Sequence, residues 1–274
     1  MAMHYMFAVG FVLALALSLV THYKYRISRL RVALYSITFS YGFLGAYLMG
    51  RLYGAFLASR GETPASGLAM LGAVIFTPLM ELVTIEAERG VCRLLNRGRA
   101  KKEKPLIDLT RVDRKNTMDF LAPDVFIVML CGKIQCHING CCFGVVWPWG
   151  VYSKTMWARV FPVQLFEAGT TGLVLIVCYI IKHTRFYRRG MAFPLTAGLY
   201  CIARFGWEFL RYYPDSLRHA VLGLTVWQAC CVVVIAASAV SIVLLYKRNP
   251  SEPLMTCRQH LASTKSKRKT KDRK

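Results

Sequence analysis

Long runs of apolar residues recur along the whole chain and constrain its fold more than any other feature. An α-helix needs about 20 mostly apolar residues to cross the hydrocarbon core of a bilayer. Seven segments approach or exceed that length, so the sequence predicts an all-α integral membrane protein with seven transmembrane helices. The predicted spans are residues 4–21, 32–50, 66–85, 118–133, 163–181, 191–211 and 221–246.

The composition favours a multi-pass membrane protein over a soluble one. Hydrophobic residues make up 55% of the chain and charged residues only 18%, whereas soluble domains carry more charge. The formal net charge of +22 would suggest nucleic-acid binding in a soluble protein, but in a membrane protein it is typical of basic cytoplasmic loops. The first apolar run has no basic segment before it and no obvious A-x-A site at its end, so we expect a retained helix.

The distribution of Lys and Arg predicts the orientation of the spans. With seven spans, four basic segments all fall on one side of the bilayer, and the positive-inside rule assigns that side to the cytoplasm. The N-terminus is then outside and the C-terminus is cytoplasmic. The four segments, which hold most of the 36 Lys and Arg residues, are 24–31, 89–115, 182–189 and the tail from Lys247 onward.

The chain divides into a predicted membrane domain, residues 1–248, and a basic tail, residues 249–274. The end of the tail, STKSKRKTKDRK, has no apolar content and is predicted to be disordered. We expect it to be solvated or to contact anionic headgroups. No aromatic residue is interleaved with its charges, so we expect no nucleic-acid partner.

Polar residues of the spans gather in the half that this orientation places outside. Arg204, Glu208 and Arg211 follow one another at i, i+4 and i+7, on one face of the predicted sixth span. Polar groups are expensive in a membrane, so a one-sided set predicts a polar cavity open to the outer leaflet. A channel or a midplane carrier would place such groups centrally or at both ends. The set is Lys133, Asn139, Gln164, Glu167, Arg204, Glu208, Arg211 and Gln228.

These polar residues also allow purely structural interpretations. Arg204 and Glu208 could form an ion pair that stabilises their helix. Arg211 could extend to the interface, and Gln164 could join two helices. A seven-helix transport or sensor protein is a further hypothesis, although the one-sided distribution speaks against it. A thiol-redox enzyme is disfavoured because the chain has no CxxC pair.

The segment CGKIQCHINGCCFG, residues 131–144, is the densest group of reactive side chains. Its cysteines are separated by gaps of four, four and zero residues, which do not match a structural zinc site, so we expect no metal and no cofactor. A disulfide is an alternative, because the segment is predicted to lie outside. Asn139-Gly140 predicts a turn. Lys133 supplies a cation, and a cation beside flexible backbone suits a phosphate headgroup.

The same segment resembles the signature of the prolipoprotein diacylglyceryl transferase family, G-R-I-G-[NC]-[FL]-[LI]-N-G, which is often followed by C-C-[YF]-G. The resemblance continues in order and with suitable spacing to about residue 230. Seven spans with an outside N-terminus and a cytoplasmic C-terminus are also what this family shows. The further matching motifs are PWGV at 148–151, FPVQLFEAG at 161–169, ARFGWEFLR at 203–211, GLTVWQ at 223–228 and, less specifically, GRLYGAF at 50–56.

The resemblance implies a transferase of the bacterial cytoplasmic membrane. The family moves the diacylglyceryl group of phosphatidylglycerol to the thiol of the lipobox cysteine in prolipoprotein signal peptides, at the outer face. A thioether forms and glycerol phosphate leaves. The implied partners are phosphatidylglycerol, prolipoprotein signal peptides and membrane lipids. Such chemistry needs a cation at the departing phosphate, a group that deprotonates the thiol and a lipid-accessible cavity.

The resemblance also implies roles for individual residues. Lys133 and Arg204 would bind the phosphate and stabilise the leaving group. Asn139 and Gln164 would position the headgroup, and Glu167 and Glu208 would orient the cations. The predicted catalytic residues are therefore Arg204, His137 and Glu208, and the predicted substrate-binding residues are Lys133, Asn139, Gly140, Gly144, Gln164, Glu167 and Arg211.

The chain departs from the family pattern at several positions. Lys133 stands where the family has an Arg and lacks its bidentate fork. Phe161 replaces a His before Pro162, and the family's H-G-G has no counterpart in SGLAMLGAVIF, residues 66–76. His137 could supply the base instead, since an unperturbed His titrates near pH ~6.5. An altered or inactive phospholipid-binding paralogue therefore stays an alternative to an active transferase.

Overall fold

Helices make up most of the molecule. The computed structural model describes residues 5–25, 29–62, 69–100, 114–213, 215–218 and 221–248, and the predicted basic tail lies outside these ranges. The long helices are α1 (Tyr5–Tyr25), α2 (Arg29–Ser59), α3 (Met70–Ala100), α4 (Arg114–Ile138), α5 (Val163–Lys182), α6 (Ala192–Glu208) and α8 (Val226–Arg248). The remaining elements are the four-residue helix α7 (Asp215–Arg218) and two strands, β1 (Val146–Ser153) and β2 (Ala158–Val160).

Each of the seven predicted spans overlaps one long helix. Three helical segments of the described chain are long and apolar enough to cross a membrane, judged by length and composition, and Tyr5–Leu17 in α1 is a shorter apolar helix. The three segments are Met70–Ala100, Val163–Lys182 and Val226–Lys247. The helix count of the prediction is therefore confirmed, whereas the orientation of the termini stays a prediction.

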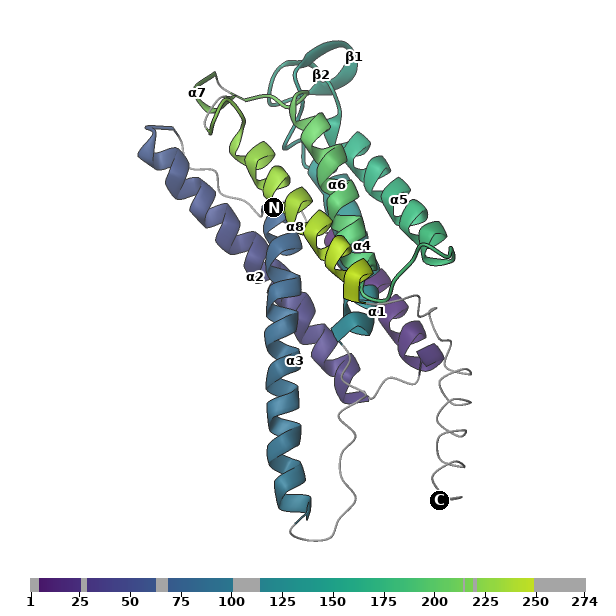
Figure 1. The fold of residues 1–274 in the computed structure, drawn as a ribbon. Coiled ribbons are helices and arrows are strands. Elements are labelled where there is room, and N and C mark those ends of the chain that lie inside the picture. The colour runs from purple at the N-terminus through teal and green to yellow at the C-terminus, as the bar shows by residue number, and fades with distance from the viewer. Residues whose placement is uncertain are drawn as a thin grey trace.

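The prediction of an all-α fold was wrong for the segment between α4 and α5. This segment forms an antiparallel hairpin, in which β1 pairs with β2 through Val151↔Val160, Tyr152↔Arg159 and Ser153↔Ala158. The hairpin arises because the chain leaves α4 and enters α5 at the same end of the bundle, so the connection stays at the surface and pairs its own backbone groups. Figure 1 shows the hairpin and α7 at one end, and the C-terminal part of α3 extending beyond the opposite end.

The helices pack in neighbouring pairs around α4 and α6. α6 contacts α8, α1 contacts α4, and α4 adjoins both α5 and α6. At the centre, Phe126 of α4 meets Tyr200 of α6 edge-on, with ring centroids 5.5 Å apart. α2 and α3 approach so closely that a Cβ added to Gly72 would lie 2.3 Å from the carbonyl oxygen of Gly45, the small-residue packing typical of membrane helices. The buried core thus fixes α4 and α6 against each other.

Asp119 joins α4 to the start of α6. Asp119 is a charged residue inside the fourth predicted span, and α4 continues through it. Its side chain is 2% exposed and accepts hydrogen bonds from the backbone N–H groups of Gly190 at 2.9 Å and Ala192 at 3.0 Å. The first N–H groups of a helix have no acceptor within the helix, so this carboxylate caps α6 from a neighbouring helix. The contact sets the position of α6 along α4.

We expect Asp119→Ala to lower the free energy of unfolding by about 1–3 kcal/mol, because two buried N–H groups lose their acceptor. Asp119→Asn keeps one acceptor oxygen and should therefore lower the free energy of unfolding by a smaller amount. Denaturant or thermal unfolding of the purified protein in detergent measures both changes. Equal stability of all three proteins would show that the cap contributes nothing.

Candidate functional site

Glu167 is the centre of a buried group of charges. It lies near the start of α5 and is 1% exposed. Its carboxylate pairs with three cations from different parts of the chain: Lys133 on α4, Arg204 on α6 and Arg211 after α6. The Arg204 Nη1–Glu167 Oε1 and Arg211 Nη2–Glu167 Oε2 distances are both 2.8 Å. One carboxylate therefore ties together three separate elements.

Glu208, the last residue of α6, holds the two arginines from another side. Its Oε2 pairs with Arg204 Nη1 and lies 3.6 Å from Arg211 Nε. Its Oε1 accepts hydrogen bonds from the Tyr213 hydroxyl at 2.5 Å and from the Thr225 hydroxyl at 3.2 Å. Burial, reinforced by the nearby Glu208 charge, raises the pKa of the Tyr213 phenol, so this residue remains an O–H donor.

We call Lys133, Glu167, Arg204, Glu208 and Arg211 the charge cluster. All five side chains are buried. Buried charges are costly unless they are paired, and here three cations share two carboxylates. Within the described residues the cluster therefore carries one excess formal positive charge. A buried site of this kind is suited to an anion.

Arg211 reaches the cluster in a way that the sequence did not predict. Arg204, Glu208 and Arg211 were expected on one helical face, but α6 ends at Glu208 and Arg211 follows it in an antiparallel bridge with Gly144. A Cβ added to Gly144 would lie 2.6 Å from the carbonyl oxygens of both Leu210 and Phe161. Only glycine fits there, so this residue lets three segments meet and directs Arg211 inward. Contact between Gly144 and a substrate stays a prediction.

Gln164 lies beside the turn that follows α4. It is 3% exposed, and its Nε2 donates to the backbone carbonyl of Cys141 at 2.5 Å. Its Oε1 has no hydrogen-bond partner among the described residues. A buried oxygen without a donor is costly, so this amide is available to a substrate hydroxyl or to water.

Three other predicted site residues lie in the last turn of α4 or just after it. Asn139 is exposed and accepts a hydrogen bond from Gln135 Nε2 at 2.8 Å. Gly140 has a positive φ of 65°, as the Asn-Gly turn predicted. His137 is half-buried in the last turn of α4. In the part of the chain that the structure describes, neither the Asn139 nor the His137 side chain forms a hydrogen bond or ion pair with the charge cluster.

Sequence reasoning missed two residues of the site, Tyr213 and Thr225, which both donate to Glu208. Thr225 belongs to a capping box at the start of α8. The Gln228 N–H donates to the Thr225 hydroxyl at 3.1 Å, and the Thr225 N–H donates to Gln228 Oε1 at 3.0 Å. The T-x-x-Q spacing is a known helix-start signal and could have placed both residues. Gln228, one of the polar residues predicted in the outer half, lies in the first turn of α8.

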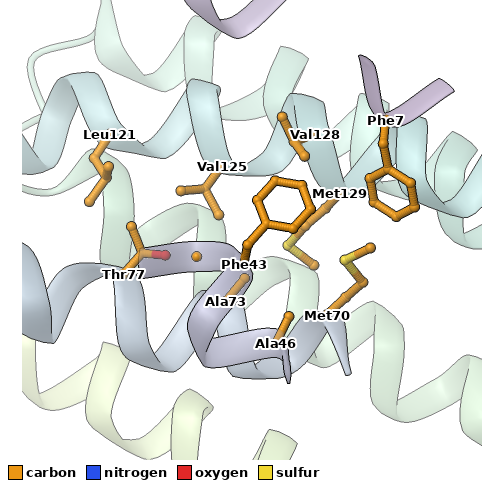
Figure 2. Close-up of a pocket in the computed structure, with 11 residues that line it drawn as sticks. Phe7, Phe43, Ala46, Met70, Ala73, Thr77, Leu121, Val125, Val128 and Met129 are labelled. Carbon is orange, nitrogen blue, oxygen red and sulfur yellow. The ribbon is translucent and has the colours of Figure 1, made fainter. Parts of the chain in front are cut away.

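An apolar cavity lies among α1, α2, α3 and α4 (Figure 2). It encloses about 450 Å³ of empty space, including some that is open to the surroundings. Thr77 contributes the one hydroxyl of the lining, and its Oγ1 has no hydrogen-bond partner among the described residues. Met129, which lines the cavity, precedes Lys133 by one turn of α4. The lining residues are Phe7, Gly42, Phe43, Ala46, Met70, Ala73, Thr77, Leu121, Val125, Val128 and Met129.

Long apolar helices around a buried cluster of opposite charges define a helical membrane protein with a polar site near one end. Comparison with known families identifies it further. The family model described as prolipoprotein diacylglyceryl transferase matches residues 106–244, which is half of the chain and contains the whole charge cluster. The chain belongs to this family.

The curated relatives bear the name phosphatidylglycerol–prolipoprotein diacylglyceryl transferase. The protein of Methylococcus capsulatus is 35% identical over 144 residues, covering 47% of this chain and 51% of the relative. The protein of Pseudomonas paraeruginosa is 31% identical over 150 residues, which cover 50% of this chain and 53% of the relative. The protein of Hydrogenovibrio crunogenus is 33% identical over 139 residues, which cover 48% of this chain and 52% of the relative. The chain thus spans about half the length of the curated relatives it matches.

Glu167→Gln should destabilise the protein strongly, because it leaves three buried cations without their shared carboxylate. We expect a loss of roughly 3–5 kcal/mol in the free energy of unfolding. Glu86→Gln is the matched control, since Glu86 pairs with Arg89 at 2.9 Å on the exposed surface of α3 and such pairs contribute at most about 1 kcal/mol. A Glu167→Gln protein as stable as the control would contradict a structural role for the cluster.

Proposed function

We propose that this protein transfers the diacylglyceryl group of phosphatidylglycerol to the lipobox cysteine thiol of prolipoproteins, at the outer face of the bacterial cytoplasmic membrane. The single observation that carries the proposal is the excess positive charge of the buried cluster. The phosphodiester of phosphatidylglycerol carries one negative charge and would balance it. The names of the relatives support the same substrates.

The charge cluster would act on the departing phosphate. As the thiol sulfur bonds to the glycerol carbon, the bond from that carbon to the phosphate oxygen breaks, and negative charge grows on the leaving glycerol phosphate. Arg204 and Lys133 are positioned in advance by Glu167 and therefore need little reorganisation during the reaction. Glu208 is assigned to holding Arg204 and Arg211 in place, with Tyr213 and Thr225 fixing its carboxylate.

The neighbouring polar residues would position the headgroup. Gln164 has a free acceptor oxygen among the described residues, which suits a hydroxyl of the glycerol headgroup. The turn after α4 would border the phosphate, and its residues in this role are Asn139, Gly140 and Gly144. The apolar cavity of Figure 2 would hold an acyl chain, because it begins one turn of α4 away from Lys133 and its lining is almost entirely apolar.

The proposed topology places the N-terminus outside and residues 249–274 in the cytoplasm. In Figure 1 the end of α3, which holds the first part of the basic segment 89–115, lies away from the hairpin of β1 and β2. The charge cluster involves the end of α4, the start of α5 and the end of α6, which adjoin the hairpin and α7. The positive-inside rule thus supports a location of the site at the outer face.

Arg204→Ala should lower kcat for transfer by about 10²–10³, since it removes a donor aimed at the developing charge. The assay supplies phosphatidylglycerol vesicles and a lipobox peptide, and mass spectrometry detects the thioether product and the released glycerol phosphate. Arg89→Ala, at a partly exposed position of α3 outside the charge cluster, is the matched control and should transfer at the wild-type rate. Absence of product from the wild-type protein with several acceptor peptides would overturn the transferase proposal.

A phospholipid-binding paralogue without this activity is the second candidate. Lys133 in place of the family's Arg, and the missing H-G-G, favour it. The same assay separates the two candidates, because the paralogue would bind phosphatidylglycerol in an Arg204-dependent manner and form no thioether.

His137 is the proposed base for the acceptor thiol. We expect His137→Gln to lower kcat for transfer by about 10²-fold or more, because general base catalysis typically contributes at least that factor. The measurement is kcat against pH, and the control is His183→Gln, an exposed residue that directly follows α5. Full transfer by His137→Gln would assign the proton transfer to another group.

A further inference from the structure

Three thiols meet in the turn that follows α4, outside the charge cluster. The sulfur atoms of Cys136, Cys141 and Cys142 all lie within 4.8 Å of one another. No other group of three or more His, Cys, Asp or Glu side chains in the described part of the chain brings its ligand atoms so close. All three cysteines are free thiols, and Cys142 is exposed.

The fold of the turn explains how two adjacent cysteines reach a third. Spacing alone argued against an ion here, because neighbouring cysteines rarely bind the same metal. In the structure the backbone carbonyl of Cys136 accepts hydrogen bonds from the Cys141 N–H at 3.1 Å and the Cys141 thiol at 3.5 Å. Cys142 has a positive φ of 56°, which reverses the chain. This backbone conformation places the three sulfurs close together.

We propose that Cys136, Cys141 and Cys142 bind one thiophilic metal ion, Zn²⁺ or Cu⁺. With metal–sulfur bonds of about 2.3 Å, the sulfurs around one ion lie about 4 Å apart, so only small side-chain movements are needed. Thiolates select these soft ions over Mg²⁺ or Ca²⁺. Each thiol binds as a thiolate and releases its proton to water. Three protein ligands leave a coordination position for an exchangeable ligand.

A hydrogen bond connects the proposed ion site to the polar site. The carbonyl of Cys141 accepts the Gln164 side-chain amide at 2.5 Å. An ion that fixes Cys141 therefore also fixes Gln164. The metal site does not depend on the transfer reaction, and ion binding is measured without any lipid or peptide substrate.

The test is a titration of the reduced, metal-free, full-length protein with Zn²⁺, and separately with Cu⁺, against a chromophoric chelator. We expect one tightly bound ion per chain in the wild type and in Cys92→Ser, the matched control on α3. The variants Cys136→Ser, Cys141→Ser and Cys142→Ser should each bind more than about tenfold more weakly, since even the loss of an outer-sphere partner costs that much. Comparison of the Zn²⁺ and Cu⁺ titrations identifies which ion the site prefers.

A second measurement needs no substitution and so does not depend on the folding of variants. Mass spectrometry follows alkylation of each cysteine in the wild-type protein with and without the ion. The three thiols should be protected by the ion, whereas Cys92 should react at an unchanged rate. Equal alkylation of the three thiols in both states would overturn the proposal. A disulfide between any two of them in the freshly isolated protein would also overturn it.

Discussion

The buried carboxylate of Glu167 is the interaction on which the rest of the site depends. It contacts cations from α4, from α6 and from the segment after α6, so the three pieces of chain are held at one point. Each of these cations would be costly to bury alone. The arrangement is stable because the charges compensate one another, and it is incomplete because the cations outnumber the carboxylates. The atoms that stabilise the site are therefore the same ones that we propose to bind an anion.

The surrounding structure holds this point from several directions. Asp119 fixes the start of α6 against α4, and the aromatic contact between Phe126 and Tyr200 fixes the middle of the two helices. Beyond α6, Gly144 allows the backbone to come close enough to aim Arg211 at the cluster. The capping box at Thr225 starts α8 and at the same time supplies a donor to Glu208. Fold-determining contacts and site contacts thus share residues.

The sequence allowed the helices and most of the cluster to be predicted. Apolar runs of membrane-spanning length mark the helices, and buried charges in such runs are rare enough to identify Glu167, Arg204 and Glu208. What could not be predicted depends on backbone pairing between distant segments. The hairpin, the bridge that carries Arg211 and the meeting of adjacent thiols have no periodic signal in the sequence. The capping role of Asp119 also has no local signal, because its partners, Gly190 and Ala192, lie some seventy residues later in the chain.

That separation has a consequence for how the protein enters its membrane. α4 carries Asp119 near one end and Lys133 near the other, and both side chains find their partners only in segments that are made later. A helix with two unpaired charges is poorly soluble in lipid. In the proposed topology, α4 would therefore stay in contact with water or with the insertion machinery until α5 has supplied Glu167 and the start of α6 has emerged. The three helices would pass into the bilayer as one unit, and the order of synthesis becomes part of how the site is assembled.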